Sequence, residues 1–196
     1  MAQRILSATA PLAALLLAAC AAVGNAPADD PSPGAATSLP PAVEGMAPTP
    51  YTWEQIRWSH PVGASVTYRN ESAGSEPVFT RMTWVESSDE GCAIASAAGP
   101  GLDTLPPVEG AAPQAWAQLR DHALFPAGAT TVTREPRETP AGTFDCWKYV
   151  VESSPDATTT FWFATESAGS PVDVVVTTSG EETSRMLLVE STRRAL

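Results

Sequence analysis

Turn-forming residues divide the chain between residues 61 and 191 into short segments rich in β-branched and aromatic residues, and this pattern limits the fold more than any other feature. Such segments, bounded by Gly, Pro, Ser and Asp, are typical of strands joined by short connections. The predicted strands are residues 66–68, 78–86, 92–97, 130–135, 143–152, 158–165, 172–178 and 183–191. Closely spaced strands usually pair with their neighbours, so we expect about eight of them in a curled antiparallel sheet or an incomplete β-barrel.

One helix is predicted among these strands. Residues 114–123 place Trp116, Leu119 and Ala123 on a single apolar stripe, at spacings of three and then four residues. We expect this helix to pack on the sheet, which makes the domain mostly β with an α+β arrangement. A Pro- and Gly-rich loop is predicted before it, over residues 99–113.

Alternation along the strands predicts which side chains share a face. Met82 and Trp84 lie on the same face of the second predicted strand. Phe161, Trp162 and Phe163 place large aromatic side chains on both faces of another strand. Both faces of that strand should therefore be covered, one of them by the helix.

The first nineteen residues have the features of a secretory signal. Arg4 supplies a positive charge, and the apolar run over residues 8–19 is too short to span a bilayer. The run ends in Leu17-Ala18-Ala19-Cys20, which resembles the lipobox of bacterial lipoproteins. The resemblance implies cleavage before Cys20 and a diacylglyceryl group on its thiol. The alternative is an ordinary secretory signal in which Cys20 has no such role.

The acidic composition limits the partners of the chain. The formal net charge is −11, so nucleic acid and anionic lipid headgroups are both repelled. Membrane attachment must then come from the acyl chains on Cys20. Because Ala21 rather than Asp follows the cysteine, the resemblance implies the periplasmic face of the outer membrane in a Gram-negative cell, and otherwise the cell envelope.

Three regions are expected along the chain. Residues 1–19 are the signal peptide, residues 20–50 are the lipidated Cys20 with a tether, and residues 51–196 are the folded β-rich domain. The tether should be disordered because its Ala, Pro and Gly residues cannot bury enough surface to offset chain entropy. The aromatic residues that open the domain predict either a short helix or an irregular cover for the core.

Two further cysteines, Cys92 and Cys146, remain once Cys20 carries lipid. In an oxidising compartment they could form a disulfide that closes a loop of roughly 50 residues, which would stabilise the fold by about 4 kcal/mol on a chain-entropy argument. The alternative is two separate buried thiols that act as small apolar side chains. The sequence does not decide between them, because a disulfide requires the two strands to be adjacent.

No motif for catalysis, metal binding or cofactor binding is present. His60 and His122 have no nucleophile at a recognisable spacing, and the Cys and His residues lack the spacing of metal ligands. A surface or helix-capping role is predicted for each histidine, and the alternative is a general base in a hydrolase. We therefore expect no enzyme activity, no catalytic residues, no metal and no cofactor.

Part of the C-terminal half resembles a known type of envelope protein. The resemblance lies in the turn at residues 140–146 (PAGTFDC), the strand at residues 161–164 (FWFA), Pro171-Val172 and Met186-Leu187-Leu188. These segments are similar to parts of bacterial outer-membrane and periplasmic proteins with the lipoprotein-carrier (LolA/LolB-like) type of fold, loosely over residues 60–195. The resemblance implies an incomplete β-barrel wrapped on a helix, with a hollow that holds acyl chains. It carries over no individual ligand residue, because the matching positions are turns and strand hydrophobes.

Six Trp residues can either fill the core or line a pocket. For a pocket between sheet and helix, we expect the lining to include Trp116, Phe161, Phe163 and Met186. The first hypothesis is a non-enzymatic module that binds an apolar ligand or a lipoprotein. The second is a structural or protein-interaction lipoprotein without a ligand, and the third is a hydrolase.

Cys20→Ser should abolish incorporation of labelled palmitate and release the protein from the membrane fraction, because the acidic surface offers no other attachment. Metabolic labelling followed by fractionation measures both effects. Cys92→Ser is the control and should keep both the label and the membrane association. A Cys20→Ser protein that still fractionates with membranes would contradict the lipid anchor.

Overall fold

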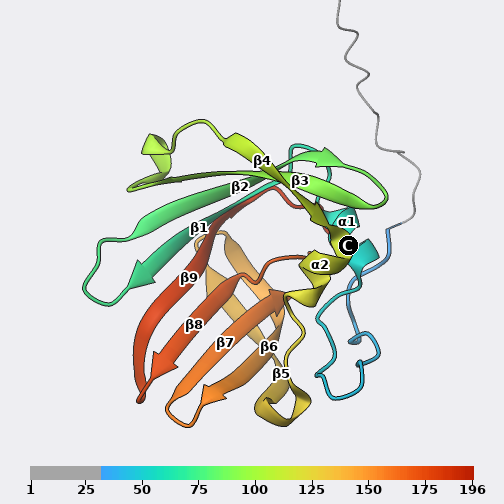
Figure 1. The fold of residues 1–196 in the computed structure, drawn as a ribbon, viewed down its shortest axis with the longest axis vertical. Coiled ribbons are helices and arrows are strands. Elements are labelled where there is room, and N and C mark those ends of the chain that lie inside the picture. The colour runs from blue at the N-terminus through green and yellow to red at the C-terminus, as the bar shows by residue number, and fades with distance from the viewer. Residues whose placement is uncertain (1–31) are drawn as a thin grey trace, which may run out of the picture. The chain divides into compact units, whose positions relative to one another are not determined.

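Nine antiparallel strands form one continuous sheet that curls on itself without closing (Figure 1). The computed structural model describes residues 32–196, apart from the side chain of Glu109. The predicted signal peptide, Cys20 and the first part of the predicted tether lie outside these residues. The mostly β, curled antiparallel sheet is confirmed, with nine strands where the sequence predicts about eight.

The strands form two meanders that are joined through the first and last strands. Their bounds are β1 Ser65–Ser72, β2 Val78–Ser87, β3 Gly91–Gly99, β4 Glu109–Ala115, β5 Thr130–Thr139, β6 Gly142–Ser154, β7 Ala157–Ala164, β8 Asp173–Thr178 and β9 Glu181–Ser191. Across the sheet the order is β4-β3-β2-β1-β9-β8-β7-β6-β5. The meander β1–β4 therefore meets the meander β5–β9 where β1 pairs with β9, through partners such as Tyr68 and Leu188.

The additional strand is β4, which forms one edge of the sheet. Its Ala, Gly and Pro content gives little β preference, so the sequence predicts a loop up to residue 113 and a helix from residue 114. In the structure Pro113 of β4 lies opposite Ala93 of β3. An edge strand tolerates proline because its outer side needs no N–H donor. Since the end of β4 pairs with β3, α2 spans only Trp116–Asp121, and the helix is shorter than predicted.

A capping box starts α1 (Trp53–Ser59), so the aromatic opening of the domain is a helix. The hydroxyl of Thr52 accepts a hydrogen bond from the backbone N–H of Gln55 at 3.3 Å, and the Gln55 side chain accepts one from the N–H of Thr52 at 2.9 Å. Ile56 on this helix is buried. The helices α1 and α2 pack on each other at the open side of the curled sheet (Figure 1).

The folded region begins earlier than predicted, which corrects the tether boundary at residue 50. Ala36 and Ala47 are buried, and the backbone N–H of Ala36 donates to the carbonyl oxygen of Thr165 at 2.9 Å. The Tyr149 hydroxyl donates to the carbonyl oxygen of Pro48 at 2.7 Å. Composition predicts what a segment can bury by itself, whereas here the sheet supplies the partners.

One compact unit, Pro31–Leu196, contains the whole sheet and both helices. All nine strands pair only with one another within it, and the buried core described here lies inside it as well. This unit therefore has the hydrogen-bonded sheet and the core that an independently folding domain requires.

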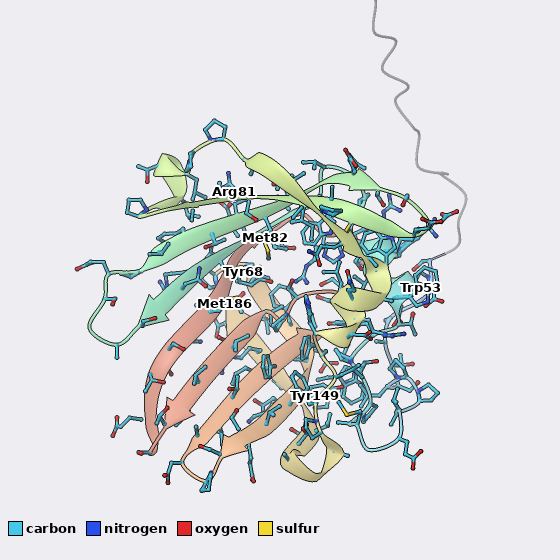
Figure 2. The ribbon with its side chains drawn as sticks, viewed as in Figure 1. Trp53, Tyr68, Arg81, Met82, Tyr149 and Met186 are labelled. Atoms are coloured by element: carbon cyan, nitrogen blue, oxygen red, sulfur yellow. The ribbon has the colours of Figure 1, made fainter. Side chains whose placement is uncertain are left out.

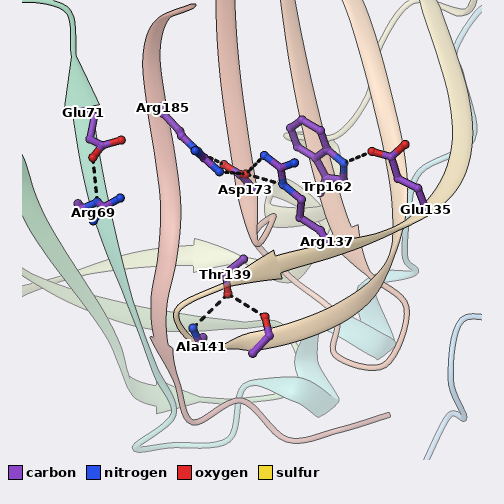
Figure 3. A network of polar contacts seen from close by, with 10 residues as sticks. Arg69, Glu71, Glu135, Arg137, Thr139, Ala141, Trp162, Asp173 and Arg185 are labelled. Carbon is purple, nitrogen blue, oxygen red and sulfur yellow. Dashed lines mark hydrogen bonds and ion pairs between the residues drawn. The ribbon is translucent and has the colours of Figure 1, made fainter.

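A buried carboxylate ties the β5–β6 hairpin to the middle of its meander (Figure 3). Asp173 at the start of β8 is fully buried, and its oxygens accept from Arg137 Nε at 2.7 Å and from Arg185 Nε and Nη2 at 3.0 and 2.7 Å. The Arg137 guanidinium also lies over the ring of Trp162, 4.1 Å from its centroid. Because Trp162 and Phe163 point to opposite faces and are both buried, both faces of β7 are covered.

Asp173→Asn should lower the free energy of unfolding by about 3 kcal/mol, because it leaves two mostly buried guanidinium groups without a counterion. Urea unfolding of the domain measures this loss. Asp145→Asn is the matched control, since the Asp145–Arg134 pair is 49% and 43% exposed. Removal of an exposed pair costs about 1 kcal/mol or less. Similar small losses in both variants would argue against a stabilising role for Asp173.

Candidate functional site

An apolar cavity of about 330 Å³ lies between the inner face of the sheet and the two helices. The sheet contributes Met82, Phe161, Phe163, Val174 and Met186 to its lining. Phe161, Val174 and Met186 are cross-strand partners on β7, β8 and β9, so they form one continuous row. Figure 2 shows where Met82 and Met186 lie, on the two meanders that meet at β1 and β9.

The opposite side of the cavity comes from the helices and the residues beside them. This side is lined by Leu119 of α2, by Ala123 and Phe125 after α2, and by Ile56 of α1. Phe125 stacks on Phe161 with 4.8 Å between ring centroids and 27° between ring planes. The helical cover therefore contacts the sheet directly at one end of the aromatic row.

Several of the inward-facing side chains remain only half buried. They include Met82, Leu119, Phe125, Phe161, Val174 and Met186. Native cores seldom leave voids larger than a water molecule. This space is therefore a hollow beside the packed core, and an apolar guest in it would bury the surface that these side chains still expose.

The loop before β8 closes one end of the cavity with Gly169, Ser170 and Pro171. The carbonyl oxygen of Ser170 accepts from Arg193 Nη1 at 2.8 Å, and that of Pro171 accepts from the Tyr68 hydroxyl at 3.0 Å. Tyr68 is itself fully buried. These two hydrogen bonds hold the loop against the sheet, so this end wall is a rigid part of the site.

His60 is buried behind the same loop and packs on Trp84, with 4.0 Å between ring centroids. Gly169 has φ +120°, and a Cβ there would lie 2.2 Å from Cε1 of His60, so only glycine fits. Nδ1 of His60 lies 2.7 Å from the carbonyl oxygen of Ile56, which assigns the proton to Nδ1. Burial, together with the positive charge of Arg193, lowers the pKa of His60 from 6.5 to about 3.

The two histidines therefore differ in their environments. His122 is exposed at the C-cap of α2 and borders the cavity, which agrees with the predicted capping role. The prediction of a surface or capping role is wrong for His60, which is a neutral core residue. Its position was not evident from sequence because the loop that covers it, residues 168–171, lies far along the chain.

Three of the four predicted lining residues, Phe161, Phe163 and Met186, border the cavity. Trp116 does not: it is fully buried in the core, and its Nε1 donates to the carbonyl oxygen of Ser88 at 2.9 Å. As the first residue of α2, it points back toward the β2–β3 turn rather than into the hollow. All six Trp residues lie in the described part of the chain, and none of them borders the cavity.

Sequence reasoning missed Met82, Leu119 and Val174 as lining residues, although each one had a signal. Met82 and Val174 follow from strand alternation, and Leu119 lies on the predicted helical stripe. Nothing in the sequence indicated the end wall at residues 169–171, because a loop residue has no periodicity that relates it to a distant strand.

Cys92 and Cys146 are buried free thiols on β3 and β6. Five strands separate β3 from β6 in the sheet, so the adjacency that the disulfide alternative required is not present. Burial raises the pKa of Cys92 to about 11 and that of Cys146 to about 12. Both thiols are therefore protonated and unreactive at neutral pH.

Other features give less information about function. Within residues 32–196, no group of three His, Cys, Asp or Glu side chains is placed to hold a metal ion. Neither helix in this part of the chain is long and apolar enough to cross a bilayer. No protein-family model matches the chain, and a search of curated proteins finds no match either. The cavity is therefore the feature from which a function is argued.

The free energy of unfolding should fall by about 2 kcal/mol between pH 7 and pH 5 because of His60. In the unfolded chain this histidine takes up a proton as the pH falls through 6.5, whereas in the folded domain its pKa of about 3 keeps it neutral. The unfolded state thus binds more protons in this window and gains stability as the pH falls.

Urea unfolding at a series of pH values measures this slope. His60→Gln should flatten it whatever the variant's stability at pH 7, while His122→Gln, at an exposed histidine, should retain it. An unchanged slope in His60→Gln would show that other groups cause the pH dependence.

Proposed function

We propose that this chain is a lipid-anchored envelope lipoprotein whose β-rich domain binds an apolar ligand, or the acyl part of a lipoprotein, without catalysing a reaction. The observation that supports this most is the apolar cavity bounded by Phe161, Val174 and Met186. Its volume of about 330 Å³ falls in the range of small-molecule sites. It has room for on the order of ten groups the size of a water molecule or a methylene, which suits one acyl chain.

The fold supports an acyl-binding role. An unclosed sheet curled around a helical cover is the arrangement that the resemblance to the lipoprotein-carrier type implies, and in that type the hollow holds acyl chains. Here the hollow lies between β7–β9 and α2, and its lining is mainly apolar. The shape and chemistry of the hollow support the proposal independently of the resemblance.

Cys20 supplies the membrane attachment in this proposal. With a net charge of −11, the protein cannot be held by anionic headgroups, so two or three acyl chains must do so. Ala21 favours sorting to the outer membrane, with the domain on the periplasmic face in a Gram-negative cell. The domain would then meet apolar ligands close to the membrane that holds it.

Binding without catalysis is favoured over hydrolysis by the surroundings of the two histidines. Nδ1 of His60 is used by the backbone of Ile56, and burial keeps the ring neutral. His122 borders the cavity at an exposed helix end, and no nucleophilic side chain is hydrogen bonded to it among the described residues. A general base needs a substrate proton within hydrogen-bond reach, and a ring enclosed by Trp84 and Gly169 does not offer that access.

Val174→Phe should weaken binding of the uncharged fluorescent probe N-phenyl-1-naphthylamine by about tenfold, because the larger ring occupies the middle of the apolar row. Fluorescence titration of the Pro31–Leu196 domain measures the affinity. Val85→Phe is the matched control, because Val85 is exposed near the end of β2 and does not line the cavity. This variant should bind the probe like the unmodified domain.

Native mass spectrometry of the same domain, purified without detergent, provides a second readout. A bound mass in the range of a single-chain lipid would support the proposal. If the probe does not bind and no adduct is found, the cavity is not a ligand site, and a structural or protein-interaction lipoprotein becomes the better hypothesis.

A further inference from the structure

The rim of the cavity is basic in a protein that is otherwise acidic. Arg120 and His122 border the cavity, and its described lining residues include no Asp or Glu. The chain as a whole has 22 Asp and Glu residues against 11 Lys and Arg. The lining residues therefore differ in sign from the molecule as a whole, although Arg120 is paired with the carboxylate of Asp121 beside it.

Arg120 has hydrogen-bond donors to spare. Its Nε and Nη2 both lie near a single oxygen of the adjacent Asp121, at 2.8 and 2.6 Å. The two side chains are 35% and 42% exposed, so solvent screens the pair and it holds Arg120 only weakly. A guanidinium has five N–H donors, so an incoming carboxylate or phosphate can use the remaining donors or displace Asp121.

We infer that the cavity takes a single-chain amphiphile with an anionic head. The chain would lie along the row of Phe161, Val174 and Met186, and the carboxylate or phosphate would lie at Arg120 and His122. This inference rests on the proposed function and adds the charge of the ligand. It also accounts for a half-exposed Arg at the mouth of an apolar hollow, where a neutral side chain would bury more easily.

A role without a ligand is the competing explanation for these two residues. They lie at the end of α2, where basic side chains complement the partial negative charge of a helix C-terminus. In that case Arg120 and Asp121 affect only the stability of the helix end. The affinities of differently charged ligands separate the two explanations.

The experiment compares four amphiphiles with the same dodecyl chain, each below its micelle concentration, by isothermal titration calorimetry at neutral pH. Dodecanoate and dodecyl phosphate carry anionic heads, dodecyldimethylamine oxide is a dipolar head without net charge, and dodecyltrimethylammonium is cationic. The anions should bind the Pro31–Leu196 domain at least about tenfold more tightly than the cation. Whichever of the two anions binds more tightly indicates whether the cavity prefers a carboxylate head, as in a fatty acid, or a phosphate head, as in a phosphate-bearing lipid.

Two adjacent substitutions should act in opposite directions. Arg120→Gln should weaken dodecanoate binding by about tenfold and weaken amine oxide binding much less, because the ion pair with the headgroup is lost. Asp121→Asn should strengthen dodecanoate binding severalfold, because it removes the carboxylate that competes for Arg120. A helix-end role would change the stability of both variants without changing the ratio of anion to cation affinity.

Equal affinities for anion and cation, or an unchanged ratio in Arg120→Gln, would overturn this inference and leave the proposed function intact. If neither the amphiphiles nor the uncharged naphthylamine probe binds, the proposed function fails and the inference fails with it.

Discussion

The pairing of β1 with β9 is the constraint on which the rest of the structure depends. These strands come from opposite ends of the folded region, and their ladder joins the β1–β4 meander to the β5–β9 meander. A bulge between Thr67 and Tyr68 interrupts this ladder, and bulges increase the local twist of a sheet. Met82 stands on one meander and Met186 on the other. Without the β1–β9 ladder, the cavity would lose one of its walls.

Buried polar side chains also hold the curl of the sheet. Asp173 brings Arg137 and Arg185 together across β5, β8 and β9. Tyr68 and Arg193 hold the carbonyl groups of the loop before β8. A buried charge or hydroxyl is tolerated only when it is hydrogen bonded, so each of these contacts specifies one arrangement of its strands or loop. The result is a hollow whose walls are hydrogen bonded in place before binding, which reduces the conformational entropy that the protein would lose when a guest binds.

In the proposed function, the acidic surface affects membrane attachment, and the basic rim affects ligand binding. An acidic body is repelled by anionic headgroups, so the lipid on Cys20 would hold the protein while the domain stays off the bilayer surface. The basic rim at Arg120 acts over a shorter range, because salt screens exposed charges beyond about 10 Å. It would therefore select among ligands that reach the cavity, and it would not draw the whole domain to the membrane.

Local sequence determined the existence and approximate limits of strands such as β2 and β7, because alternation and flanking turns lie within each segment. The same alternation places Phe161 and Phe163 on one face of their strand. Only the tertiary structure decided that β4 is a strand, that Ala36 and Ala47 are buried, and that Trp116 belongs to the core rather than the cavity. Each of these outcomes depends on a partner elsewhere in the chain. Composition sets how much surface a segment can bury, whereas the assembled sheet decides which groups it is buried against.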